Sequence, residues 1–343
     1  MVGLDIGTSS SKVVQLKYLS ERAVLETYGE ILNENYFKEA NASGSGFLRY
    51  TDSNLVELVK DIFRESKITT TDTVMSIPST SSFITTLSFP LIPKKEIETA
   101  IPYEARKYIP ISISEVILDW EIMEPEEKEN KTEVLLVAVP REMIEKLKRI
   151  STAAGLNLKA LEVETFSSVR SLMRRDPYPT AIVNIGHLNT SIAMVEKGKM
   201  RVSHNISRGA QEITRALEHG LGVSAEKAEE VKKETGLSSR MENREIDSVI
   251  RPLVEILFSE IERMISLQNR HSDHRLQKII LTGGGANLKG LVEYAGLKFG
   301  LESSLGNPFN RLVTPTFLQP VLKEIGPNFS VAVGLALHEI SVN

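Results

Sequence analysis

The chain has 343 residues, a formal net charge of −4, and 41% hydrophobic and 25% charged residues. This length allows about two domains of ~150 residues, and the composition is ordinary for a soluble globular protein. The acidic balance argues against a general nucleic-acid binder, and the absence of cysteine excludes disulfides, thiolate metal sites and a cysteine nucleophile. Because the N-terminus starts directly with a strand pattern and no apolar run approaches ~20 residues, we expect neither a signal peptide nor a membrane span.

Residues 2–16 predict a strand, a tight turn and a return strand. The turn at residues 7–10 consists of Gly, Thr and Ser, small residues that leave backbone N–H groups free to face an anion. Asp5 ends the first strand beside the turn, where its carboxylate can hold the water shell of a Mg²⁺. Lys12 opens the return strand and can supply a positive charge to a phosphate. Alone, the pattern also suits an ordinary hairpin with a surface Asp.

The remainder of the first half predicts alternating strands and helices. A strand is expected at 23–31, a flexible loop at 41–46, a helix capped by Ser53, and a strand at 73–77. The following elements are a strand at 84–89, a helix at 94–109, a strand at 116–123, a charged hairpin tip at 124–131, a strand at 133–139, a helix at 141–154 ended by Gly155, and a strand at 158–163. We interpret residues 84–154 as a small α/β unit inserted into the first half.

The second half opens by repeating the first hairpin. In residues 182–195, Asn184-x-Gly186 takes the place of Asp5-x-Gly7, at an offset of 184 − 5 = 179 residues. Two related hairpins half a chain apart predict two related halves that face one ligand. A glycine cluster at 283–285 follows the apolar run 279–281 and precedes a helix-like segment.

Helices make up most of the rest. Ser224 is expected to cap a helix that carries Glu229 and Lys232 three residues apart, which is also the spacing of an ordinary exposed ion pair. We expect a long amphipathic helix at 251–270, a helix at 287–299, and a small-residue helix within 324–337.

The two hairpins and the glycine cluster, in this order, resemble the phosphate-1, phosphate-2 and adenosine motifs of the actin-like ATPase superfamily. Within it, the chain is similar to the PilM family, FtsA-like proteins of type IV pilus assembly. This likeness covers essentially the whole chain. It rests on residues 105–110 running into 115–119, on 228–232, on 250–254 and on the tail from 325 to 337.

The resemblance implies an α/β, actin-like fold of two related halves around a cleft that holds ATP and Mg²⁺. The first half would be 1–83, completed by about 155–180 and 322–343, with an inserted subdomain at 84–154. The second half would be 181–321, with one subdomain at about 222–275. Asp5 matches the metal-side carboxylate. The other residues implied to contact the nucleotide are Gly7, Thr8, Ser9, Ser10, Lys12, Gly186, Gly209, Glu229, Lys232, Gly283, Gly284, Gly285 and Ala286.

The second hairpin departs from the superfamily pattern, which has Asp where this chain has Asn184. An amide can hydrogen-bond a metal-bound water, but it brings no negative charge and is a poor general base. Glu164 lies roughly where relatives keep a Gln or Glu that orients the attacking water, although a surface carboxylate is the plainer interpretation. We assign Asp5, Asn184 and Glu164 to the catalytic centre and expect ATP binding with at most slow hydrolysis.

The resemblance also implies a partner, the cytoplasmic N-terminal peptide of a PilN-like inner-membrane protein, bound beside the inserted unit. Tyr108 with Arg106 and Lys107 suits a peptide that carries apolar and acidic groups, and the alternative is that Tyr108 only packs the inserted helix on its sheet. We therefore expect a cytoplasmic scaffold held at the inner membrane by its partner, with self-association left open. An FtsA-like division filament and a small-molecule kinase remain alternatives. Against the first, we expect no membrane-binding helix after Leu337; against the second, no base candidate stands out beyond Asp5.

Overall fold

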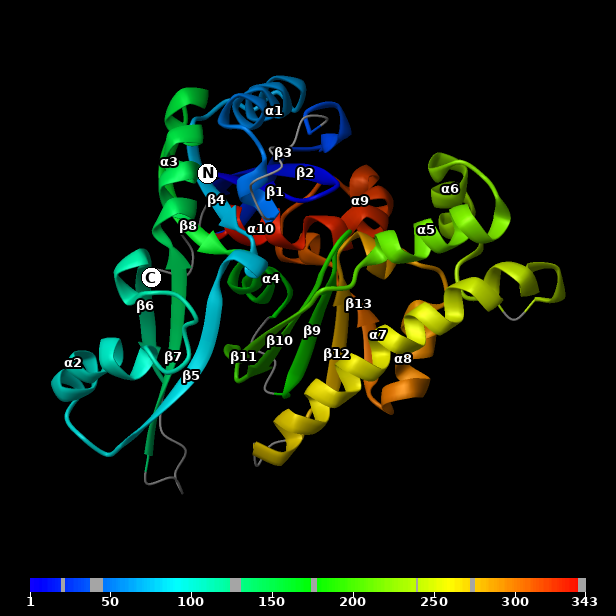
Figure 1. Cartoon of the computed structure of the whole chain (residues 1–343). Coiled ribbons are helices and arrows are strands. Elements are labelled where there is room, and N and C mark those ends of the chain that lie inside the picture. The colour runs from blue at the N-terminus through cyan, green and yellow to red at the C-terminus, as the bar shows by residue number, and fades with distance from the viewer. Residues whose placement is uncertain are drawn as a thin grey trace.

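The computed structural model describes residues 1–19, 22–37, 46–123, 131–173, 178–238, 240–271 and 275–338. The expected loop at 41–46 and the charged hairpin tip at 124–131 lie almost wholly outside these ranges, and so does the end of the chain after residue 338. In the described ranges, the strands form two five-stranded sheets and one three-stranded sheet (Figure 1). None of the described helices has the length and apolar character of a membrane span.

The first sheet has the strand order β3-β2-β1-β4-β8. Its strands are β1 (Val2–Ile6), β2 (Ser10–Leu19), β3 (Arg22–Leu32), β4 (Asp72–Ile77) and β8 (Asn157–Val163). The first three pair antiparallel, and β4 and β8 continue the sheet in parallel. Helices α1 (Asp52–Glu65) and α3 (Arg141–Ala154) pack on one face, and α10 (Ser330–Ala336) covers the other and crosses α4 (Glu164–Leu172).

The second sheet repeats this order as β11-β10-β9-β12-β13. Its strands are β9 (Thr180–Ile185), β10 (Thr190–Glu196), β11 (Lys199–Ile206), β12 (Lys278–Thr282) and β13 (Glu302–Leu305), paired in the same directions. Asn184 stands opposite Ser191 on the neighbouring strand, as Asp5 stands opposite Lys12. The two halves are therefore structural repeats. The second core also holds α5 (Ala210–Leu221), α6 (Ala225–Thr235), α7 (Arg244–His271) and α8 (Leu291–Phe299).

The third sheet projects from the first half in the order β5-β7-β6 (Figure 1). It consists of β5 (Phe83–Pro90), β6 (Val116–Ile122) and β7 (Lys131–Pro140), and α2 (Lys94–Ala105) packs on one face through Ile97 and Ile101. The hydroxyl of Thr86 donates a 2.8 Å hydrogen bond to the carbonyl oxygen of Arg201, so this sheet also touches β11 of the second half.

Helix α3, which the sequence-based boundary at residue 154 includes in the inserted unit, packs in the core of the first sheet. Its apolar side chains Met143, Leu147 and Ile150 are buried in the core of the first sheet, together with residues of α1. The helix connects β7 of the third sheet to β8 of the first sheet. Its amphipathic pattern shows that one face is buried but not which of the two sheets covers that face. We therefore propose residues 83–140 as the inserted unit and assign α3 to the first half.

Two predicted helix ends follow their local signals. Ser224 caps α6 by accepting a hydrogen bond from the backbone N–H of Lys227, and Gly155 ends α3. The prediction that Ser53 caps α1 is wrong, because the hydroxyl of Thr51 accepts the backbone N–H of Asn54 and the helix begins at Asp52. The helix expected from residue 287 begins only at Leu291, because a 3₁₀ turn over Gly284–Asn287 and the left-handed Gly290 precede it.

Candidate functional site

A cleft of about 980 Å³ lies between the two five-stranded sheets, and this volume is within the usual range of small-molecule sites. The β1–β2 turn, the β9–β10 turn and the glycine loop after β12 all line it. Fifteen of the sixteen residues expected at the catalytic centre or the nucleotide are brought together here: Asp5, Gly7, Thr8, Ser9, Ser10, Lys12, Glu164, Asn184, Gly186, Glu229, Lys232, Gly283, Gly284, Gly285 and Ala286.

Gly209 is the exception. It precedes α5 and lines a smaller cavity next to the cleft. A Cβ atom at this position would lie 2.4 Å from the carbonyl oxygen of His187, so the glycine lets α5 approach the second turn closely. Gly209 packs against that turn, and its neighbour Ala210 lines the main cleft.

Asp5 is the buried carboxyl group of the first turn. Only 8% of the residue is exposed, and the hydroxyl of Ser76 donates a 2.8 Å hydrogen bond to its Oδ1. Burial raises the pKa of Asp5, against the opposing effects of the Lys12 charge and the hydrogen bond from Ser76. A cation placed beside this carboxyl group would favour its ionised form, and oxygen-rich surroundings suit Mg²⁺.

Lys12 already has a counter-charge in the cleft. Its Nζ donates a 2.6 Å hydrogen bond to the hydroxyl of Ser10 and lies 3.5 Å from a carboxylate oxygen of Glu30. The Ser10 hydroxyl in turn donates to Glu30 at 2.6 Å. Sequence reasoning missed Glu30, although the register of β2 and β3 places it directly opposite Lys12. An anion that binds the first turn must compete with Glu30 for the lysine.

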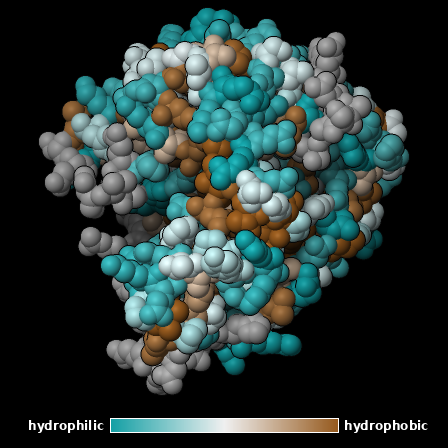
Figure 2. All heavy atoms as spheres, turned by 60° about the vertical axis from the view of Figure 1, so that its left-hand side comes forward, coloured by the Kyte–Doolittle hydropathy of each residue, from teal (hydrophilic) through white to brown (hydrophobic). Residues whose placement is uncertain are grey.

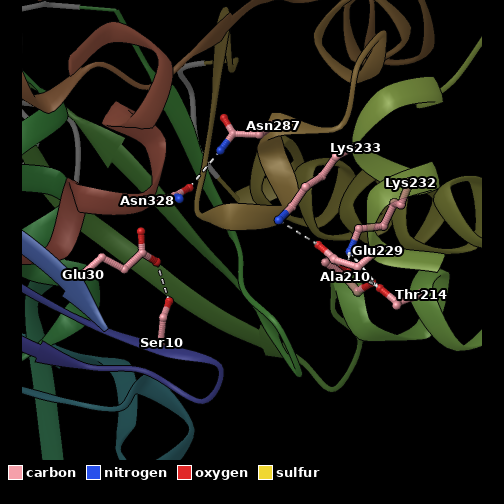
Figure 3. Close-up of polar contacts among 9 residues, drawn as sticks. All are labelled: Ser10, Glu30, Ala210, Thr214, Glu229, Lys232, Lys233, Asn287 and Asn328. Carbon is pink, nitrogen blue, oxygen red and sulfur yellow. Dashed lines mark hydrogen bonds and ion pairs between the residues drawn. The ribbon is translucent and has the colours of Figure 1, made fainter. Parts of the chain in front are cut away.

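The second turn and the glycine loop meet at Asn184. This residue stands opposite Thr282 of β12, and a Cβ atom on the next residue, Gly283, would lie 2.3 Å from the Asn184 side-chain oxygen. With its φ of +82°, the position requires glycine. The loop is joined to the C-terminal segment by a 2.8 Å hydrogen bond from Asn287 to Asn328, seen between the two walls of the cleft in Figure 3.

His187, in the second turn, is another cleft residue that sequence reasoning did not identify. Burial lowers the pKa of its imidazole, and the nearby Lys232 lowers it further. The imidazole is therefore neutral at neutral pH and can accept or donate a hydrogen bond there.

Glu164 is the first residue of α4 and forms part of the cleft wall. One carboxylate oxygen accepts hydrogen bonds from both the backbone N–H of Ser79 (3.0 Å) and its hydroxyl (2.6 Å). Burial raises the pKa of Glu164 to about 7, and the neighbouring Asp5 adds to this effect. The alternative of a surface carboxylate does not hold. A carboxyl group that titrates near pH 7 is suited to proton transfer at neutral pH.

Glu229 and Lys232 form a partly buried pair on α6, whereas the sequence also allowed an exposed one. The Nζ of Lys232, a residue that is 8% exposed, donates to Glu229 (2.5 Å) and to the hydroxyl of Thr214 (2.8 Å). Burial lowers the pKa of Lys232, while for Glu229 the hydrogen bonds outweigh the effect of burial and lower its pKa. Lys233 adds a second cation 3.6 Å from Glu229, and the group faces Ser10 and Glu30 across the cleft (Figure 3).

Arg106, Lys107 and Tyr108 lie outside the cleft, just after α2 in the inserted unit. Tyr108 is 52% exposed, whereas the next residue, Ile109, is buried in the core of the unit, so the packing alternative for Tyr108 does not hold. Lys107 forms a 2.8 Å ion pair with Glu104. Figure 2 brings the side of the molecule that carries this unit forward and shows hydrophobic side chains gathered near the middle of that face.

Comparison with solved structures defines the class of fold. MreB5 of Spiroplasma citri bound to ADP superposes with a TM-score of 0.57 at 14% identity, covering 99% of this chain and 96% of that chain. The ethanolamine utilization protein EutJ from Carboxydothermus hydrogenoformans gives 0.56 at 18% identity, over 98% and 88% of the two chains. The predicted actin-like ATPase fold is confirmed.

Within this class, a PilM–PilN type IV pilus biogenesis complex superposes with a TM-score of 0.83 at 24% identity, over 99% of this chain and 98% of that chain. The family model of the type IV pilus assembly protein PilM matches residues 3–340, and the chain belongs to this family. The cell division proteins FtsA of Streptococcus pneumoniae and Rhizobium meliloti are 22% and 28% identical over 195 and 181 residues, or 51% and 46% of this chain. These matches span 42% and 40% of the FtsA proteins, less than half of their length.

Proposed function

We propose that this protein is an ATP-binding scaffold of the type IV pilus inner-membrane assembly platform. It stays in the cytoplasm and captures the cytoplasmic N-terminal peptide of a PilN-like membrane protein. The observation that carries the proposal is membership of the PilM family over residues 3–340, in a chain whose two repeated hairpins converge on one cleft.

Mg·ATP fits the chemistry of the cleft residues. Asp5 would hold the water shell of the metal, and the backbone N–H groups of the turn at 7–10, together with Lys12, would bind the β-phosphate. Glu229 and Lys232 would flank the adenosine on the opposite wall, next to the glycine loop. The solved structures of MreB5 bound to ADP and to AMPPNP support an adenine nucleotide.

Hydrolysis is proposed to be slow. Asn184 brings no negative charge to the second turn, so the water shell of the metal has a carboxylate on one side only. The candidate general base is therefore the carboxylate form of Glu164. Because the pKa of Glu164 is raised to about 7, this form predominates only above pH 7.

Calorimetric titration with ATP and Mg²⁺ tests the nucleotide part of the proposal. Asp5→Ala and Lys12→Ala are expected to weaken ATP binding at least about tenfold, since each loses a charge-assisted contact. Lys17→Ala is the matched control, because Lys17 is an exposed lysine on the same strand. Wild-type affinity in both cleft variants would remove the first turn from the phosphate site.

The inserted unit is proposed as the docking surface for the membrane partner. It exposes several large apolar and aromatic side chains, namely Leu91 (61%), Tyr103 (67%), Tyr108 (52%), Ile117 (37%) and Trp120 (37%). Rigid aromatic side chains of this kind supply much of the binding energy at protein interfaces. The solved PilM–PilN complex supports a PilN-like protein as the partner.

Co-purification from membranes tests the partner part. Tagged wild-type protein is expected to retain a PilN-like, single-span membrane protein, and Tyr108→Ala to retain less of it. Phe317→Ala is the matched control, because Phe317 is an aromatic residue that is 79% exposed and lies outside the inserted unit. Equal retention by both variants would show that Tyr108 is not part of the docking surface.

A further inference from the structure

Arg49 is a cation of the cleft for which the described residues provide no ion pair. It ends the short 3₁₀ helix Gly46–Arg49 and lines the cleft on the same wall as Ser10 and Lys12. Its Nη2 donates a 2.7 Å hydrogen bond to the hydroxyl of Tyr50, and its Cζ lies 4.8 Å from the centre of the Tyr50 ring. Its Nε is buried and has no hydrogen-bond partner among the described residues.

The other cations of the cleft are already satisfied. Lys12 is paired with Glu30, Lys232 and Lys233 are paired with Glu229, and Lys289 donates to a backbone carbonyl oxygen. A buried N–H group without an acceptor costs free energy, and that cost disappears when a ligand supplies the acceptor. The planar guanidinium group offers donors in a geometry that matches phosphate oxygens.

The position of Arg49 indicates which phosphate it would contact. Its 3₁₀ helix touches the turn Ser79–Ser81, and Ser79 holds Glu164. If the adenosine lies against Glu229 and the glycine loop, and the β-phosphate lies on the first turn, then the end of the phosphate chain lies on the Glu164 side of the cleft. Arg49 is one of the residues that line the cleft, and the contact of its 3₁₀ helix with the turn Ser79–Ser81 places it on this side.

Lys146 of α3 fixes the backbone on both sides of Arg49. The lysine is 6% exposed, and its Nζ donates hydrogen bonds to the carbonyl oxygens of Leu48 and Tyr50. It also lies 3.4 Å from a carboxylate oxygen of Asp52. The cleft segment is therefore held by the helix that directly follows the inserted unit.

We infer that Arg49 contacts the terminal phosphate of a bound nucleoside triphosphate and gives the cleft its preference for the triphosphate over the diphosphate. Lys146 is a positioning residue that keeps Arg49 on the cleft wall. This inference rests on the proposed nucleotide-binding function and adds the group that distinguishes ATP from ADP.

The test compares the affinities for ATP and ADP, each with Mg²⁺, by calorimetric titration. Arg49→Gln is expected to weaken ATP binding about tenfold or more, the effect of losing a charge-assisted hydrogen bond, and to change ADP binding less than about twofold. Arg64→Gln is the control, because the Arg64 side chain is 67% exposed on α1 of the same half. Lys146→Met is expected to reduce the ATP preference in the same direction.

The outcomes separate this inference from the function on which it rests. A wild-type protein that binds neither nucleotide refutes the proposed function and the inference together. A wild-type protein that binds both, with Arg49→Gln weakening both equally or neither, refutes the inference alone. If Lys146→Met does not fold, the Arg49→Gln comparison decides the result by itself.

Discussion

Replacing Glu164 by Gln is expected to stabilise the protein at alkaline pH and to slow any ATP turnover. In the folded protein, burial raises the pKa of this carboxyl group from its ordinary 4.5 to about 7. The folded state therefore binds the proton more tightly than the unfolded state does. It follows that the contribution of Glu164 to the free energy of unfolding falls as pH rises from 4.5 to 7 and is constant above pH 7.

The size of the effect follows from the same two values. Each pKa unit corresponds to about 1.4 kcal/mol, so the charged carboxylate costs the fold up to about 3 kcal/mol above pH 7. A glutamine oxygen can still accept both hydrogen bonds from Ser79, so the variant removes the charge and keeps the contacts. Because Glu164 retains some solvent exposure, we expect a gain of about 1–3 kcal/mol at pH 8 and little gain at pH 4.5.

Urea unfolding at pH 4.5 and pH 8 measures this difference. The control is Glu162→Gln, two residues away, which weakens the contacts of Glu162 with Arg170 and Ser167 and is expected to destabilise the protein at pH 8. If Glu164→Gln gave the same gain at both pH values, or a loss at pH 8, the buried charge would not be the cause.

Three further changes test other parts of the site and fold. Asn184→Asp is expected to raise ATP turnover, measured by phosphate release, because general-base assistance is worth ~10²–10⁴ in rate and even partial restoration is detectable. If the wild type already hydrolyses ATP rapidly and the substitution does not change the rate, this expectation is wrong. Gly334→Ala is expected to lower the unfolding free energy by about 1–3 kcal/mol, since its Cβ would lie 1.9 Å from the Ser167 carbonyl oxygen; an unchanged urea midpoint contradicts the close crossing of α10 and α4. Lys232→Met is expected to weaken the binding of ATP but not of inorganic triphosphate in competition titrations, because Lys232 is placed on the adenosine side. An equal loss of affinity for both ligands contradicts that placement.

The repeated hairpins could be predicted because their signal is local. Asp5-x-Gly7 and Asn184-x-Gly186 each lie between apolar strands, and the two strand orders proved identical. The place of α3 could not be predicted in the same way. A helical apolar pattern shows that one face is buried, but it does not show which of two neighbouring sheets covers that face. Thr51 and Ser53 are likewise both acceptable caps, and only the position of the Asn54 N–H distinguishes them.

Of the residues missed at the site, His187 lies inside the second hairpin itself, whereas Glu30 and Arg49 are brought in by tertiary structure. Glu30 reaches Lys12 through the register of β3, and Arg49 reaches the cleft through a segment held by Lys146, 97 positions later in the chain (146 − 49 = 97). Neither belongs to a motif with fixed spacing. Gly209 was implied by the resemblance alone, and the close approach of α5 to the second turn at this glycine could not be read from the sequence.

The most direct test of the central claim is the binding of the partner peptide to the full chain. A labelled peptide with the sequence of the cytoplasmic N-terminus of the PilN-like protein is titrated with the protein, and fluorescence anisotropy is recorded with and without Mg·ATP. We expect saturable binding of one peptide per chain, retained in Lys12→Ala and weakened in Tyr108→Ala, because the cleft and the docking surface are separate. Absence of saturable binding, or displacement of the peptide by ATP from a shared site, would contradict it.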